Sequence, residues 1–99
     1  MIHVLAIITA KPGQRDSVLR IFNANVPAVH AEAGCIEYGA TVDIDGADPA
    51  FGPDTFVVVE KWESLAALKA HAVAPHMAAY GQKTKDMVAK RAVHVLTPA

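Results

Sequence analysis

The chain opens on an apolar segment, Ile2 to Ala10, which is rich in isoleucine and valine and is followed by Lys11-Pro12-Gly13. β-branched residues closed by a Pro-Gly pair predict a strand and a turn. The segment is shorter than the roughly 20 residues that cross a bilayer, and no positively charged region precedes it. We therefore expect a strand here rather than a leader or a membrane anchor.

The hydrophobic period changes from about Gln14 onward. Apolar residues then recur three and four positions apart, at Val18, Ile21, Phe22, Val26 and Val29. This spacing predicts one face of a helix. Pro27 falls inside the pattern and lacks an N–H, so we expect it to kink or divide the helix. Gly34 suits the helix end.

Two further strands are predicted in the middle of the chain. Cys35 to Ile44 alternates loosely and contains β-branched residues, and Thr55 to Trp62 has the clearest strand pattern of the sequence. Between them lies the only loop-like run of any length, Gly46 to Asp54. Two strands joined by such a loop are expected to pair antiparallel.

The remaining segments predict helix and then strand. Ser64 is a candidate N-cap for a helix that carries Leu65, Leu68 and Ala72. Pro75 suits the first turn of a fresh helix, which would carry Met77, Tyr80, Thr84 and Val88. The last segment, AVHVLTP, predicts a strand that ends at a proline. The order β-α-β-β-α-β predicts an α+β fold of ferredoxin-like type, with one domain over residues 1–99 and a four-stranded antiparallel sheet.

Both faces of the predicted sheet are apolar. On the first strand Val4, Ala6 and Ile8 share one face, while Leu5 and Ile7 lie on the other. The helices of this fold cover a single face, and soluble monomers rarely expose a large apolar patch. We therefore expect a homodimer that packs through the sheet face.

Composition and charge narrow the function classes. Just over half of the residues are hydrophobic, 19% are charged and the formal net charge is −1. This balance favours a globular domain and gives no basic surface for nucleic acid or anionic membranes. Cys35 is the one cysteine, so no internal disulfide forms, which fits the cytoplasm; we expect it to be an inert buried thiol.

Glu60 and Trp62 lie two residues apart on the clearest strand and so share a face. A carboxylate beside an indole can line a ligand pocket, where Trp62 would stack on a flat aromatic compound. Two structural alternatives stay open. Trp62 can be a core residue beneath the following helix, and Glu60 can pair with a lysine or arginine of a neighbouring strand.

His71 and His76 are the second candidate pair. Five residues rotate about 140° on a continuous helix, so the two rings face each other only if the helix breaks at Pro75. No carboxylate follows at helical spacing and no cysteine pair is present, so we expect no metal site. A general base, or a histidine that bonds backbone at a helix end, fits better. Tyr38 and Tyr80 can supply hydroxyls to the same cleft, or pack as core residues.

Two stretches of the chain resemble the antibiotic biosynthesis monooxygenase (ABM) domain family. They are EAGCIEYGATVD, from Glu32 to Asp43, and FVVVEKWESLAALKAHAVAPHMAAY, from Phe56 to Tyr80. The family hallmark has Glu-x-Gly-Cys, a tyrosine, a strand ending in Glu-x-Trp, and a helix with His-x-x-x-x-His. The resemblance covers nearly the whole chain.

The resemblance implies a dimeric α+β barrel and a pocket between the sheet and the helices. It also implies an oxidoreductase, a monooxygenase that oxidises a small quinol or a phenolic or polyketide-like aromatic with O2 and uses no metal or flavin cofactor. By resemblance, His71 is the base or proton shuttle, Trp62 stacks on the substrate, and Glu60 orients an imidazole or a substrate hydroxyl. Tyr38, His76, Tyr80 and Phe56 are the expected substrate-binding residues.

Two other functions fit the same resemblance. One is a non-catalytic module that binds a small aromatic ligand, and the other is a haem-binding or haem-degrading protein. The first strand is apolar from Val4 to Ile8, where several active members of the family carry asparagine. That difference counts against the haem-degrading and polyketide-oxygenase alternatives.

Overall fold

The computed structural model describes all 99 residues. Its elements follow in the order β1 (Ile2–Ala10), α1 (Arg15–His30), β2 (Cys35–Thr41), β3 (Thr55–Trp62), α2 (Leu65–Ala72), α3 (Pro75–Thr84) and β4 (Val88–Leu96). None of the helices is long and apolar enough to cross a membrane.

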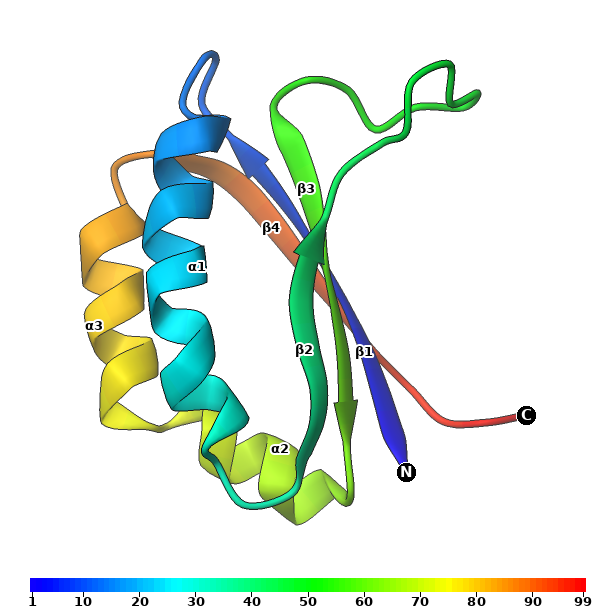
Figure 1. Cartoon of the computed structure of the whole chain (residues 1–99), viewed down its shortest axis with the longest axis vertical. Coiled ribbons are helices and arrows are strands. Elements are labelled where there is room, and N and C mark those ends of the chain that lie inside the picture. The colour runs from blue at the N-terminus through cyan, green and yellow to red at the C-terminus, as the bar shows by residue number, and fades with distance from the viewer.

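The strands form one four-stranded sheet in the order β2-β3-β1-β4, and every neighbouring pair is antiparallel. This confirms the predicted ferredoxin-like α+β architecture and the pairing of β2 with β3. All three helices lie on the same side of the sheet (Figure 1). A cavity lined by residues of the sheet and the helices lies on that side.

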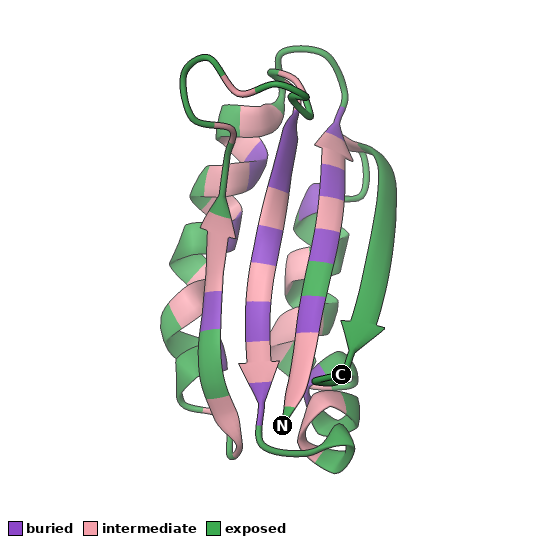
Figure 2. Cartoon of the chain, turned by 90° about the vertical axis from the view of Figure 1, so that its right-hand side faces the viewer, coloured by how far each residue is buried: buried purple, intermediate pink, exposed green.

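Burial alternates along the two central strands, as their apolar pattern requires. Val4, Ala6 and Ile8 of β1 are buried, and so are Phe56, Val58, Glu60 and Trp62 of β3. These side chains face the helices, and the apolar ones form one cluster with Val18, Phe22 and Val29 of α1. Figure 2 shows the alternation from the uncovered side, where buried positions on β1 and β3 are separated by more exposed ones.

The other face of the sheet is apolar and has no covering element. The strand register places Leu5 beside Val59, and Ile7 beside both Val57 and Ala92. Leu5 is 37% exposed, and β4 is exposed along nearly its whole length. The two-faced apolar character predicted from the sequence is therefore present, with one face left open.

The break before Pro75 confirms the fresh helix predicted there, and it makes the order β-α-β-β-α-α-β. The helical region differs from the prediction in two details. Pro27 does not divide α1, which runs through to His30. Val88 was expected on the last helix but begins β4, because α3 ends at Thr84 and the backbone N–H of Met87 returns to the Thr84 carbonyl.

Local chemistry fixes the ends of α2 and its neighbouring loop. The Ser64 hydroxyl accepts a hydrogen bond from the Ala67 N–H at 3.1 Å, which confirms the predicted N-cap. Gly34 has a positive φ of +85°, and a Cβ at this position would lie 2.6 Å from the Ala67 Cβ. The loop between α1 and β2 is therefore packed tightly against α2 at a position that only glycine fits.

Candidate active site

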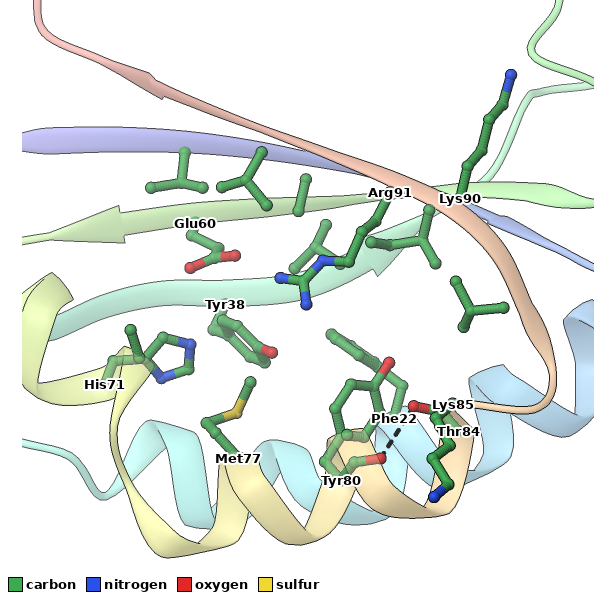
Figure 3. Close-up of a pocket in the computed structure, with 18 of the residues that line it drawn as sticks. Phe22, Tyr38, Glu60, His71, Met77, Tyr80, Thr84, Lys85, Lys90 and Arg91 are labelled. Atoms are coloured by element: carbon green, nitrogen blue, oxygen red, sulfur yellow. Dashed lines mark hydrogen bonds between the residues drawn. The ribbon is translucent and has the colours of Figure 1, made fainter.

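A cavity of about 520 Å³ lies between the helix-facing side of the sheet and α3. Hydrophobic side chains make up 13 of the 20 lining residues. Its polar groups come from separate elements, with Tyr38 on β2, Glu60 on β3, His71 on α2, Tyr80 on α3 and Arg91 on β4 (Figure 3). This volume and this mainly apolar lining with few polar groups suit a small organic ligand.

Glu60 and Trp62 interact directly with each other at the end of β3. The Trp62 indole Nε1–H donates to Glu60 Oε1 at 2.9 Å, and both side chains are buried. Glu60 forms no ion pair, so the neighbouring-strand partner considered for it is absent. The indole instead satisfies one carboxylate oxygen of a residue that lines the cavity.

His71 packs against this pair. Its ring centroid lies 4.6 Å from the Trp62 ring and 5.4 Å from the Tyr38 ring. The residue is only 5% exposed and lines the cavity. Two aromatic side chains therefore fix the plane of the imidazole at the cavity wall.

Glu32 links His71 to His76. Its Oε2 atom lies 2.8 Å from His71 Nδ1 and 2.9 Å from His76 Nε2. The carboxylate accepts, so we assign the protons to these two nitrogens. His71 Nε2 is then the unprotonated nitrogen, available to accept a proton from a ligand.

The helix break at Pro75 explains how the two histidines meet, and the loop before β2 supplies the carboxylate. Glu32 is the first residue of the Glu-x-Gly-Cys motif by which the chain resembles the family, and its contacts with the two histidines were not predicted. It lies 39 residues from His71 and 44 from His76 along the chain, beyond the reach of any local spacing rule.

Two imidazoles and a carboxylate are also a set of ligands that transition metals accept. Their donor atoms lie within 4.8 Å of one another. The contacts at 2.8 and 2.9 Å are hydrogen-bond distances, and we interpret the three residues as a hydrogen-bonded triad.

Burial changes the ionisation of the cavity groups. It raises the pKa of Glu60, an effect that the Trp62 hydrogen bond partly opposes. Burial, reinforced by the charge of Glu60, raises the pKa of Tyr38 far above its usual range. The pKa of Tyr80 is also raised by burial, and the charge of Arg91 partly opposes the rise. Both tyrosines therefore keep their hydroxyl protons near neutral pH.

The predicted site residues divide into two groups. Tyr38, Glu60, His71 and Tyr80 line the cavity. Trp62 and Phe56 are fully buried, and His76 lies on the far side of Glu32; these three do not line it.

Phe22 lines the cavity although the sequence indicated only a core position for it. Its ring stacks on Tyr38 at 5.2 Å and contacts Phe56 and Tyr80 edge-on. Phe22 therefore covers Phe56 and presents its own aromatic surface to the cavity. The sequence did carry a signal for this role, because Phe22 is an aromatic residue on the helix face that packs on the sheet.

Comparison with known proteins identifies the family of the chain. The antibiotic biosynthesis monooxygenase family matches residues 1–83. The chain belongs to this family. It is 39% identical over 102 residues to YgiN of Escherichia coli, a protein named as a probable quinol monooxygenase, and the match spans 99% of this chain and 98% of that protein.

Solved structures of the family share the fold. The crystal structure of PA3566 from Pseudomonas aeruginosa is 26% identical, with a TM-score of 0.83 over 99% of this chain and 93% of that one. A crystal structure described as an antibiotic biosynthesis monooxygenase is 25% identical, with a TM-score of 0.84 over 100% of this chain and 99% of that one.

Proposed function

We propose that the protein is a monooxygenase that oxidises a small quinol with O2 and needs no metal or flavin. The observation that carries the proposal is His71, held by Glu32 through Nδ1 with its ring at the wall of an aromatic cavity. Membership of the family and the likeness to a relative named as a quinol monooxygenase support it.

In the proposed reaction the quinol ring packs among Phe22, Tyr38 and Tyr80. His71 Nε2 accepts a proton from one ring hydroxyl, and the electron-rich quinolate reduces O2 and forms a carbon–oxygen bond to it. Loss of water from the resulting hydroperoxide breaks the O–O and C–H bonds. The sum is quinol plus O2 giving hydroxyquinone plus water, so the substrate supplies every electron.

The other site residues act on this step indirectly. Trp62 is fully buried, so we assign it to holding His71 by ring contact and Glu60 by the indole hydrogen bond. Glu60 faces the cavity and orients a substrate hydroxyl. The apolar lining keeps bulk water from the quinolate, which limits side reactions.

Oxygen uptake with a panel of hydroquinones tests this function. Each rate is compared with a protein-free blank, because hydroquinones autoxidise. His71→Asn offers an amide in place of Nδ1 for Glu32 but removes the basic Nε2, and we expect a loss of about 100-fold or more in kcat. Val73→Ala, at a position that is 82% exposed, is the control.

Equal uptake with and without the protein would contradict the proposal. Saturable binding of a hydroquinone without oxygen consumption would instead favour a binding module. An unchanged rate in His71→Asn would remove the base from this mechanism.

We also propose that two copies pack through the open sheet face. Support comes from the apolar outer side chains of β1 and β3, which no element of the same chain covers. In such a dimer each cavity keeps its own helices and lies on the side away from the partner.

A further inference from the structure

Arg91 is the one cationic group of the cavity whose head is aimed into it. It lies on β4 opposite Ile8 of β1, on the helix-facing side of the sheet. Figure 3 shows its guanidinium reaching into the cavity, whereas the ammonium groups of Lys85 and Lys90 extend away from it.

The guanidinium has no partner within the chain. It takes part in none of the ion pairs and donates no hydrogen bond to Glu60 or to the tyrosines. Its charge nevertheless reaches the site, since it lowers the pKa of both Glu60 and Tyr80 against the rise caused by burial. Arg91 is exposed to solvent, and its N–H donors reach the cavity without an acceptor from the chain.

Arginine donors in a planar fork match an oxyanion, and charge-assisted bonds of this kind are among the strongest in proteins. The rest of the lining is suited to an aromatic ring. We propose that Arg91 binds an oxyanion of the substrate, so that the preferred substrates are acidic aromatic compounds with an oxygen other than the hydroxyl that meets His71. This proposal names the substrate class of the proposed function. Its statement about turnover rests on that function, but its statement about binding does not.

The oxyanion can come from two sources, a carboxylate substituent or a second phenolate oxygen on the ring. Both present the same chemistry to Arg91, and a binding assay without turnover separates them. Its result also does not depend on whether the protein consumes oxygen.

In the first arm, equilibrium dialysis under argon compares 1-naphthoate with the neutral 1-naphthamide. We expect the wild type to bind the carboxylate at least about tenfold more tightly than the amide. Arg91→Gln should bring the ratio close to one while amide binding changes less than twofold. Arg91→Lys should give an intermediate ratio, because the charge remains but the fork is lost.

In the second arm, the absorbance of 4-nitrophenol reports the ionisation of the bound phenol. Binding to the wild type should shift its titration to lower pH, and Arg91→Gln should abolish the shift. Lys83→Gln removes the same charge from an exposed position outside the cavity and is the control for both arms.

A response in the first arm alone assigns Arg91 to a carboxylate substituent, and a response in the second alone assigns it to a ring phenolate. Either result supports the proposal. An unchanged response of Arg91→Gln in both arms would overturn it, as would the absence of saturable binding of either probe at millimolar concentration. If binding is selective but no hydroquinone is oxidised, the oxidation proposal fails and the oxyanion site stands.

Discussion

At the scale of single residues, the site depends on one buried carboxylate that faces the cavity and another that faces two histidines. Glu60 accepts from an indole and Glu32 from two imidazoles. The first is positioned by the strand that carries it. The second reaches the site from a loop. A separate prediction follows from each carboxylate.

Glu60 should make stability depend on pH. Because its pKa is raised in the folded state, the folded chain holds the proton more tightly than the unfolded one. This stabilisation is fully present below the ordinary value of 4.5 and is lost as the pH rises through the folded-state pKa. Glu60→Gln keeps an acceptor for Trp62, so the wild type should lose stability relative to this variant over that range.

Urea unfolding at a series of pH values measures the difference. Glu63→Gln, at an exposed carboxylate, serves as the control and should parallel the wild type. A constant difference between wild type and Glu60→Gln from pH 4 to pH 8 would argue against a carboxyl that resists ionisation.

Glu32 should act through His71 and not through substrate binding, since it does not line the cavity. In Glu32→Gln the acceptor for two imidazoles becomes a neutral amide, which loses a charged hydrogen bond. We expect kcat to fall on the order of 10- to 100-fold with little change in KM.

His76→Gln is the matched comparison, because its amide nitrogen can replace Nε2 as a donor to Glu32. It should retain more of kcat than Glu32→Gln does. A rise in KM equal to the loss of kcat/KM, with kcat unchanged, would show that Glu32 contributes to binding and not to positioning.

At the scale of elements, the sequence predicted most of the fold because strand and helix periods are local signals. The strands appear where β-branched runs lie, and Ser64 and Pro75 mark the starts of α2 and α3. Cys35 to Ile44 was predicted too long, since pairing with β3 ends at Thr41. Val88 fitted the helical spacing by coincidence, and pairing with β1 prevails there.

The site was less predictable than the fold. Glu60, Trp62 and His71 were predicted as site residues, because each belongs to a pair separated by only a few residues in the sequence. Glu32 and Arg91 reach the site only through the packing of a distant loop and an edge strand. Which aromatic ring lines the cavity also depends on packing, because Phe22 covers Phe56.

The contact between the α1–β2 loop and α2 should be sensitive to a single methyl group. Gly34→Ala places a side chain in the left-handed region and against Ala67, and we expect a loss of about 2–3 kcal/mol in the free energy of unfolding. Gly81→Ala meets no atom within 4 Å on α3 and should stabilise by up to about 1 kcal/mol. Urea midpoints measure both, and an unchanged midpoint for Gly34→Ala would contradict the close contact.

At the scale of the whole molecule, the open sheet face predicts the oligomeric state. Sedimentation of the wild type at about 10 µM should give the mass of two chains, because a buried apolar face favours association. Ile7→Glu places a charge at the centre of this face and should give monomers. Ala28→Glu, at an exposed position of α1, should remain dimeric. A monomeric wild type would refute the assembly.

The same two-faced sheet has a consequence for folding fidelity. Most sheets hold their register because a shift of one residue exchanges an apolar face for a polar one. Here the shift would turn Leu5 and Ile7 toward the helices and Val4 and Ala6 outward, and each face would stay apolar. The few polar residues on the strands must therefore specify the correct alignment.

Two contacts between strands supply that information. The Thr9 and Thr55 hydroxyls meet at 3.1 Å across β1 and β3, and Lys61 pairs with Glu37 at 3.1 Å across β3 and β2. A chain whose polar strand residues were replaced by apolar ones would keep its hydrophobic pattern and gain a second way to align. The threonine pair and the ion pair thus select between two otherwise similar alignments of the strands.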